Sequence, residues 1–489
     1  MNSSIVRYTL GQVLKIEAAL LLLPGIISLI YRERFGLYYL IVAAICGFLG
    51  IGMSLRKPTS FVFYLKEGCI ITSLSWIFLS FFGSLPFYLT GEIPSLTDAL
   101  FETVSGFTTT GASILPEVEY LSKCSTFWRC FTHWIGGMGV LVFLLAIIPI
   151  GGGSQMNIMK AESPGPSVGK LVPQIRSTAR ILYIIYFVLT IVEIIFLLLG
   201  DMPLFEAICT STATAGTGGF GIKNDSFTSY SPYLQWVVTV FMILFGVNFN
   251  AYYLILFKQF KKAVTMEEVL HYFAIILIAI AIIFTRIMRT FANPIDALRA
   301  SAFQVASIIT TTGFSSVDFD KWPAVCQTVL VFLMFIGACA GSTGGGIKVS
   351  RLIILRKTII KEMISYVHPK SIKKIKMDDK AIEHEVVRAT NVFFVSFVII
   401  FSLSVLLVSI DGNDLVTNFT AVAATINNIG PGLSMVGPTQ NFSHFSVFSK
   451  FILMFDMLAG RLELFPMLMM FHPGLWKDMF AYYIHKFSK

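Results

Sequence analysis

The 489-residue chain is 55% hydrophobic, has only 13% charged residues and carries a net charge of +9. Its mean hydropathy is +0.76, and a soluble chain could not hide that much apolar surface, so the composition predicts one polytopic membrane protein. The Lys and Arg residues lie mainly in loops between apolar segments, so membrane topology explains the positive charge better than nucleic-acid binding does.

Apolar segments of about 17–26 residues, the length that a bilayer demands, are the predicted spans. They lie at 9–30, 36–54, 67–90, 126–149, 180–199, 234–257, 268–286, 325–347, 391–410 and 446–471. Shorter apolar helices are predicted between spans, at 96–107, 203–214, 295–309 and 414–426. The predicted fold class is therefore an all-α polytopic membrane protein, with an N-terminal helix pair before four units of span, short helix and span.

A short glycine-bearing pattern follows each of the four short helices. It reads FTTTGAS at Phe107–Ser113, AGTGGFG at Ala215–Gly221, ITTTGFS at Ile309–Ser315 and INNIGPG at Ile426–Gly432. In the first and third copies a Phe precedes the Gly by the same ten positions, Phe101 before Gly111 and Phe303 before Gly313. Internal repetition of this kind fixes an architecture, and four unrelated polar turns are the alternative interpretation.

The chemistry of these patterns favours a cation site. Non-helical backbone at membrane depth is tolerated only where it is buried or lines a water-filled cavity. Glycine accepts positive φ, so successive carbonyls can point the same way without a Cβ clash. Four such loops around one axis would make a ring of carbonyl oxygens that replaces the hydration shell of a monovalent cation. The short helices would aim their partly negative C-terminal ends at that ring.

The predicted division of the chain follows from these units. It is an N-terminal pair, repeats 1 to 3, a basic connection, repeat 4 and a tail, at 1–62, 63–150, 175–262, 263–357, 358–388, 389–475 and 476–489. The stretch 348–388 carries eleven Lys and Arg, whereas 411–445 carries none. Positive loops stay in the cytoplasm, so the N-terminus, the connection and the tail are predicted inside and the glycine loops outside. The connection fits either anionic lipid or a cytosolic partner.

The eighth predicted span ends in GACAGSTGGGIK, Gly337–Lys348. Gly344, Gly345 and Gly346 each weaken a helix by roughly 1 kcal/mol relative to Ala. We therefore predict a break and a mobile gate there; close helix packing through small residues is the alternative.

The tenth span holds two charges, Arg461 and Glu463, inside an apolar run. Such charges normally face a cavity or a partner. Arg461 is predicted either to lie on the ion path or to hold helices together through Glu463 or backbone carbonyls. His133 has no second metal ligand at i+3 or i+4 and is predicted to be a packing residue; Glu193 receives no role.

Together these motifs resemble the Trk/Ktr/HKT superfamily of potassium transporters over essentially the whole chain. The resemblance rests on SGFTTTGAS, TGGFG, SIITTTGFSS, NNIGPG, GSTGGGIK and GRLE. The extra N-terminal helix pair resembles the TrkH-type membrane subunit of the Trk potassium uptake system more than KtrB. The resemblance implies a pseudo-fourfold pore in each chain of a homodimer, in the bacterial inner membrane. It also implies a TrkA-type cytosolic regulatory ring that binds the nucleotide, with no cofactor on this chain.

The resemblance places a potassium filter at Thr110, Gly111, Gly218, Gly219, Thr312, Gly313, Ile429 and Gly430. It places the gate at Gly344, Gly345, Gly346 and a pore-facing Arg461. Two departures matter: Gly216 competes with Gly219 in repeat 2, and Asn427-Asn428-Ile429 replaces three threonines in repeat 4. One key glycine per loop predicts fewer stacked ion sites and looser discrimination among K⁺, Rb⁺ and Na⁺.

Potassium uptake through a gated pore is thus the predicted function. The alternative is a secondary transporter of a cation or small solute, coupled to Na⁺ or H⁺, since such folds also use broken helices and repeats. An integral-membrane enzyme is disfavoured because the sequence shows no paired His, Asp and Glu cluster of metal or acid–base type.

Overall fold

The fold is described from a computed structural model for residues 2–58, 64–139, 175–369 and 374–474. Within these ranges six helices are long and apolar enough to cross a membrane. They are α1 (Ser3–Tyr31), α2 (Gly36–Ser54), α3 (Leu65–Thr90), α8 (Ile175–Leu199, with the span at Arg180–Leu199), α13 (Glu267–Ile287) and α17 (His384–Val408). Six of the ten predicted spans are confirmed by these helices.

The four predicted short helices are present within one or two residues of their expected bounds. They are α4 (Leu96–Phe107), α9 (Leu204–Gly216), α14 (Pro294–Ile309) and α18 (Leu415–Ile426). Three of them begin at an N-cap residue whose side chain accepts a hydrogen bond from a backbone N–H of the first turn. These N-cap residues are Ser95, Asn293 and Asp414. Such caps satisfy N–H groups that a helix start leaves without partners, and fix where each short helix begins.

The helix that follows the short helix in each repeat, its second predicted span, is shorter than predicted. These helices are α5 (Lys123–Gly137), α10 (Pro232–Gly246), α15 (Ala324–Ile336) and α19 (Val447–Arg461), each of 13 to 15 residues. The predicted break in the span 325–347 is confirmed, because α15 ends at Ile336 and α16 (Val349–Val367) begins only after the loop. The end of the predicted span 126–149 lies outside the described residues.

Two spans that were predicted to be continuous are broken. The chain bends by 90° between α10 and α11 (Phe249–Leu256), so a straight span at 234–257 was wrong. The helix predicted at 446–471 is divided at 462–464 into α19 and α20 (Phe465–Met470). Glu463 and Leu464 take φ values of +55° and +68°, whereas a continuing right-handed helix requires negative φ values.

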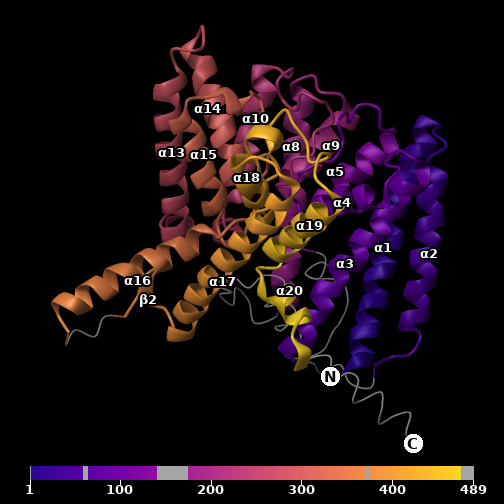
Figure 1. The fold of residues 1–489 in the computed structure, drawn as a ribbon, viewed down its shortest axis with the longest axis horizontal. Helices are drawn as coiled ribbons and strands as arrows, with labels where there is room; N and C mark the ends of the chain where they lie inside the picture. The colour runs from indigo at the N-terminus through magenta and orange to yellow at the C-terminus, as the bar shows by residue number, and fades with distance from the viewer. Residues whose placement is uncertain (1, 59–63, 140–174, 370–373, 475–489) are drawn as a thin grey trace, which may run out of the picture.

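The N-terminal pair packs on the first repeat and lies at one edge of the molecule (Figure 1). The turn between α1 and α2 carries Glu33, whose two carboxylate oxygens accept from the backbone N–H groups of Lys123 and Cys124 at 2.7 and 3.1 Å. These groups begin α5, so a residue of the extension caps a helix of the repeat. The pair is thereby fixed to repeat 1 by polar contacts as well as by apolar packing.

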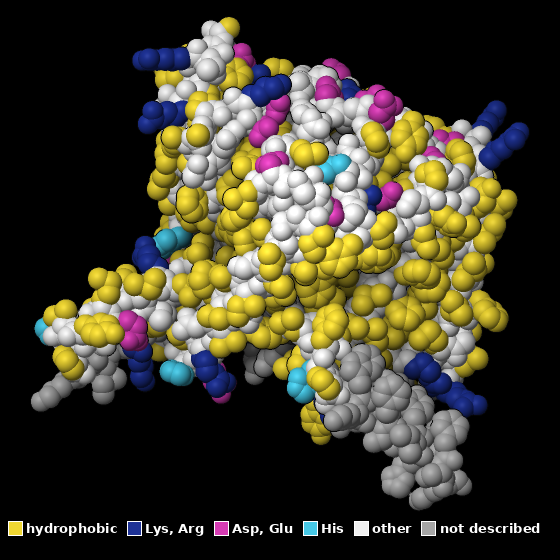
Figure 2. Space-filling model, viewed as in Figure 1, with side chains coloured by type: hydrophobic (Ala, Val, Ile, Leu, Met, Phe, Trp, Pro, Cys, Tyr) yellow, Lys and Arg dark blue, Asp and Glu magenta, His cyan; other side chains and the backbone are white. Residues whose placement is uncertain are grey.

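α16 leaves the body toward the lower left of Figure 1, and the chain returns to the body at the start of α17. Between them lies a small antiparallel hairpin, β1 (Lys376–Met377) with β2 (Lys380–Ala381). The rest of the described fold is helical, as the sequence predicts for an all-α membrane protein. Figure 2 shows apolar side chains covering the middle of one face and charged side chains gathered toward its two ends. That distribution matches a bilayer-spanning body.

The remaining elements are single turns and connections. They are α12 (Phe260–Val264), η1 (Phe319–Lys321), η2 (Ser409–Asp411) and η3 (Ser434–Val436). The buried apolar side chains form three clusters: the largest spans repeats 1 and 4 with the N-terminal pair, and the others belong mainly to repeats 2 and 3. All seven cysteines are free and buried, as expected for small apolar residues.

Candidate functional site

The four glycine-bearing segments after α4, α9, α14 and α18 share one backbone conformation. We call them the ring loops: 107–111, 215–219, 309–313 and 426–430. In each, the residue two positions before the glycine has a φ between +55° and +60°; these are Thr109, Thr217, Thr311 and Asn428. The glycines themselves, Gly111, Gly219, Gly313 and Gly430, have φ between +76° and +99°. Four sequences with different side chains therefore fold into one repeated turn.

The hydrogen bonding of the ring loops repeats with the same period. The residue before each glycine donates its N–H to a carbonyl five residues back in the short helix, over 2.8–2.9 Å. The pairs are Thr110 to Ser105, Gly218 to Ala213, Thr312 to Ser307 and Ile429 to Ala424. Repeat 2 thus aligns Gly219 with the other three glycines, and Gly216 lies at the helix end, where a Cβ would collide with the backbone of His133. This geometry favours Gly219 over Gly216.

The ring loops contact one another in a closed circle. A Cβ on Gly111 would collide with the carbonyl oxygen of Gly218, one on Gly219 with that of Thr312, and one on Gly313 with that of Ile429. The circle closes because a Cβ on Gly430 would lie 2.8 Å from the carbonyl oxygen of Thr110. All eight residues predicted for the filter therefore lie together, with each glycine against the carbonyl of the next repeat. A side chain at any of these glycines would displace a carbonyl oxygen.

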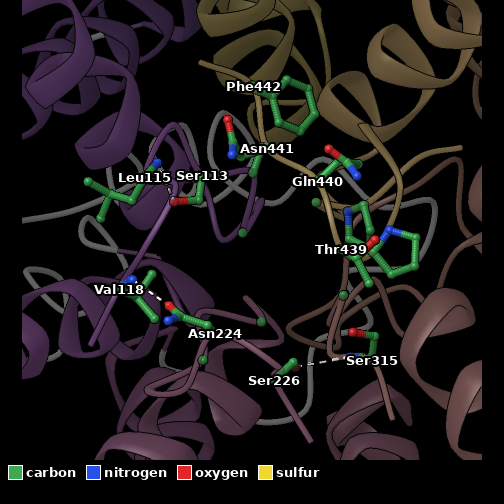
Figure 3. A pocket seen from close by; sticks show the side chains of 18 of the residues that line it. Ser113, Leu115, Val118, Asn224, Ser226, Ser315, Thr439, Gln440, Asn441 and Phe442 are labelled. Atoms are coloured by element: carbon green, nitrogen blue, oxygen red, sulfur yellow. Dashed lines mark hydrogen bonds between the residues drawn. The ribbon is translucent and has the colours of Figure 1, made fainter. Parts of the chain in front are cut away.

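A cavity of about 130 Å³ opens over this ring (Figure 3). Its floor contains the four ring glycines, and its walls come from the segments that follow the ring loops, including Ser113, Asn224, Ser315, Gln440 and Asn441. These polar groups suit a hydrated cation approaching the ring. The charged side chains that line the cavity are those of Arg129 and Lys223.

Arg129 is compensated by a buried carboxylate. Its Nε lies 2.6 Å from Oε1 of Glu102, and both side chains are almost fully buried. Glu102 also accepts from the backbone N–H of Ile114 at 3.0 Å, while Arg129 donates to the carbonyl of Gly221 at 2.9 Å. The pair therefore joins the segment after the first ring loop to the segment after the second. This pair was not predicted from the sequence; the available signal was Glu102 within an apolar short helix.

His133 has the predicted packing role. Its Nδ1 lies 2.7 Å from the carbonyl oxygen of Gly106, and its Nε2 lies 3.2 Å from the backbone nitrogen of Phe220. Because the N–H of Phe220 can only donate, Nε2 is the acceptor and Nδ1 carries the proton. A neutral histidine thus joins the first short helix to Phe220, the residue that directly follows the second ring loop. Among the described residues no group of His, Cys, Asp and Glu is arranged to hold a metal.

Aromatic residues clamp the first and third repeats from outside. Phe442, from repeat 4, packs on Phe101 with ring centres 5.8 Å apart, and Phe227, from repeat 2, packs on Phe303 at 5.5 Å. The N–H of Phe442 also donates to the carbonyl of Ser113 at 2.8 Å, and that of Phe227 to the carbonyl of Ser315 at the same distance. The equal Phe-to-Gly spacing seen in the sequence thus corresponds to equivalent contacts.

The glycine-rich loop 337–348 contacts the third and fourth ring loops, and none of its residues lines the cavity. The N–H of Gly345 donates to Oγ1 of Thr311 at 2.6 Å, and that of Gly346 to the carbonyl of Asn427 at 3.1 Å. The ammonium group of Lys348 donates a hydrogen bond to the carbonyl of Gly344. The three glycines predicted for a gate therefore contact the ends of the third and fourth short helices.

Arg461 reaches the same region from the end of α19. It donates to the carbonyl of Thr343 in the 337–348 loop at 2.8 Å and to the carbonyls of Gly136 and Gly137 at the end of α5, the latter at 2.7 Å. Glu463 instead pairs with Arg351 of α16. The sequence left two structural partners open for Arg461, Glu463 and backbone carbonyls. The observed contacts are with backbone carbonyls, and they join the 337–348 loop to repeat 1.

The chain is similar to known proteins over nearly its whole length. Residues 41–481 match the family model TrkH, described as a cation transport protein. The chain is 33% identical to the Trk system potassium uptake protein TrkH of Salmonella typhimurium over 98% of this chain and 100% of that protein. It is 30% identical to TrkG of Escherichia coli over 98% and 100%. The crystal structure of the potassium transporter TrkH from Vibrio parahaemolyticus superimposes with a TM-score of 0.88 and 32% identity, covering 97% of this chain and 100% of that one.

Proposed function

Because the chain belongs to the TrkH cation transport family and is not an enzyme, we propose that it takes up potassium through a gated, pseudo-fourfold pore. The observation that carries the proposal is the closed circle in which each ring glycine meets the carbonyl of the next repeat. Four carbonyl-bearing loops in a ring can replace the hydration shell of a monovalent cation. Thr110, Gly218, Thr312 and Ile429 supply the carbonyls, and the glycines leave room for them.

The gate in this proposal is the 337–348 loop together with Arg461. Gly344–Gly346 lie against the ring loops, and the guanidinium of Arg461 is bonded to the loop at Thr343. A fixed positive charge near a cation path opposes conduction, more strongly where water is scarce. Movement of this loop would open the path, and a cytosolic partner would drive it.

We also propose the setting of this pore. The chain lies in the bacterial inner membrane. The cavity over the ring faces outside and the basic connection lies in the cytoplasm, in accordance with the distribution of Lys and Arg. Two chains form a homodimer with one pore each, and a TrkA-type cytosolic ring, which binds the nucleotide, regulates them. These points rest on the resemblance to Trk system proteins and on the eleven Lys and Arg residues of the stretch 348–388.

The test is ion flux through purified protein in liposomes. K⁺, Rb⁺ and Na⁺ fluxes are compared for the wild type and for Gly313→Ser, whose Cβ would collide with the carbonyl oxygen of Ile429. We expect potassium flux in the wild type and a lower K⁺/Na⁺ ratio in the variant. An unchanged ratio in a folded variant would remove this loop from the filter. The same assay with an imposed proton gradient decides between a passive pore and the ion-coupled alternative.

A further inference from the structure

Glu268 is a buried carboxylate at the start of α13. It belongs neither to the ring loops nor to the lining of the cavity over them. Its side chain is only 1% exposed. It accepts from Nδ2 of Asn248 at 3.0 Å, from the backbone N–H of Ala340 at 2.6 Å and from that of Ser350 at 3.2 Å. Three N–H donors converge on one side chain, as suits a carboxylate that can only accept.

The positions of these donors give the carboxylate a particular role. The 337–348 loop has two legs: the outgoing leg, which leaves α15 and contains Ala340, and the returning leg, which leads into α16. Ser350 lies just after the returning leg. Both donate to the same oxygen, Oε1, so one atom closes the base of the loop. α16 begins at Val349, and its N-cap residue, Lys348, makes no capping hydrogen bond through its side chain. Glu268 thus supplies, from another helix, the acceptor that a helix start requires.

The third donor connects this base to the bend of repeat 2. Asn248 lies between α10 and α11, where the chain turns by 90°. Two backbone hydrogen bonds join the bend to the outgoing leg, from Cys339 to Gly246 at 3.1 Å and from Phe249 to Gly341 at 3.0 Å. Glu268 therefore lies where the bend, both legs of the loop and the start of α16 meet.

We infer that Glu268 is a positioning residue of the gate, which holds the two legs of the 337–348 loop together so that Gly344–Gly346 stay against the ring loops. That the loop is a gate rests on the proposed function. That Glu268 holds the loop in place does not depend on it. Without the carboxylate, the N–H groups of Ala340 and Ser350 lose their common acceptor. The base of the loop then opens, and its glycines leave the ring.

The test uses a native thiol as a reporter. Cys339 is fully buried beside the outgoing leg, so N-ethylmaleimide should modify it slowly in the wild-type protein. Glu268→Gln keeps the size of the side chain but turns one acceptor into a donor that faces other donors. We expect labelling of Cys339, followed by peptide mass spectrometry, to rise about tenfold or more, because charged buried hydrogen bonds are lost. Glu267→Gln is the matched control, since Glu267 pairs with Lys357 nearer the surface, and should leave labelling unchanged.

Other cysteines and ion flux separate the outcomes. Cys326 on α15 should stay protected; equal labelling of Cys326 would mean general unfolding and would overturn the positioning role, as would unchanged labelling of Cys339. Potassium flux without any partner should rise in Glu268→Gln and not in Glu267→Gln. If the wild type carries no potassium, the proposed function fails while the thiol result still decides the position of the loop. Raised labelling without raised flux would overturn the claim that the loop is the gate.

A second variant covers the case in which Glu268→Gln does not fold. Glu268→Asp keeps the charge and withdraws the carboxylate by one methylene, so it should lengthen the contacts to Ala340 and Ser350 without introducing a donor. Labelling of Cys339 should then rise by a smaller factor than in Glu268→Gln. Labelling equal to that of the wild type in a folded Glu268→Asp protein would contradict the inference.

Discussion

Asn428 donates a hydrogen bond from Nδ2 to Oγ1 of Thr110 over 3.0 Å. The two residues are 318 positions apart in the chain, yet they lie in adjacent ring loops, the fourth and the first. The same amide also donates to the carbonyl of Met457 at 2.9 Å. The departure of repeat 4 from the Thr-Thr-Thr pattern therefore places a longer side chain where the ring closes on itself.

The first prediction concerns this closure. Asn428→Ala removes both donated hydrogen bonds and should destabilise the protein by about 1–3 kcal/mol, because buried acceptors lose their donor. It should also lower the K⁺/Na⁺ flux ratio, since the fourth loop is no longer held against the first. Thr110→Ser keeps the hydroxyl and is the control. Thermal stability in detergent and flux in liposomes are the measurements, and a wild-type ratio in Asn428→Ala would contradict the role of this contact.

The second prediction separates the two roles of Arg461. Arg461→Ala removes a positive charge beside the ring loops and leaves the carbonyls of Thr343, Gly136 and Gly137 without this donor. We expect higher cation flux per folded molecule, because electrostatic opposition near a low-dielectric path is removed. Stability should fall by about 1–3 kcal/mol. Arg461→Lys, which keeps the charge but not the fork of donors, should keep flux low.

Flux normalised to folded protein decides the result. If Arg461→Ala melts early but conducts like the wild type per folded molecule, the residue is a structural anchor and does not limit conduction.

The third prediction concerns the glycine triplet. Deleting Gly344–Gly346 should raise basal potassium conduction, because the segment that contacts Thr311 and Asn427 is shortened. Gly345→Ala makes a smaller change at the same place, since its Cβ would collide with the carbonyl of Asn427. It should displace the loop and raise basal flux to a lesser degree. Wild-type flux at full expression in both variants would show that the triplet serves packing only.

A fourth prediction addresses the pair behind the first ring loop. Glu102→Gln should cost about 3–5 kcal/mol, because it leaves the buried guanidinium of Arg129 without its counter-charge. The double variant Glu102→Gln with Arg129→Leu should recover part of that loss, since no unpaired charge remains. Thermal unfolding of the four proteins in a double-mutant cycle measures the coupling. Additive effects of the two substitutions would mean that the ion pair contributes little.

The sequence by itself determined the local parts of this protein. Spans are recognised by apolar length and short helices by the apolar stretches between them, because bilayer thickness imposes these lengths on the chain. Ring glycines such as Gly111 and Gly313 were recognised because one glycine-bearing pattern recurs after the short helices, and glycine accepts a positive φ at little cost. The break before Gly344 was predicted for the same reason, since successive glycines do not sustain a helix.

The tertiary structure decided how these parts meet. Gly219 and not Gly216 aligns with the other ring glycines because the closed circle requires one register, which a single loop sequence does not contain. The bend at Asn248 and the break at Glu463 fall in apolar runs that look continuous. Side-chain contacts with other helices stabilise them: Glu268 of α13 with Asn248, and Arg351 of α16 with Glu463. Pairings of this kind depend on how separate helices pack against one another, so only the folded structure specifies them.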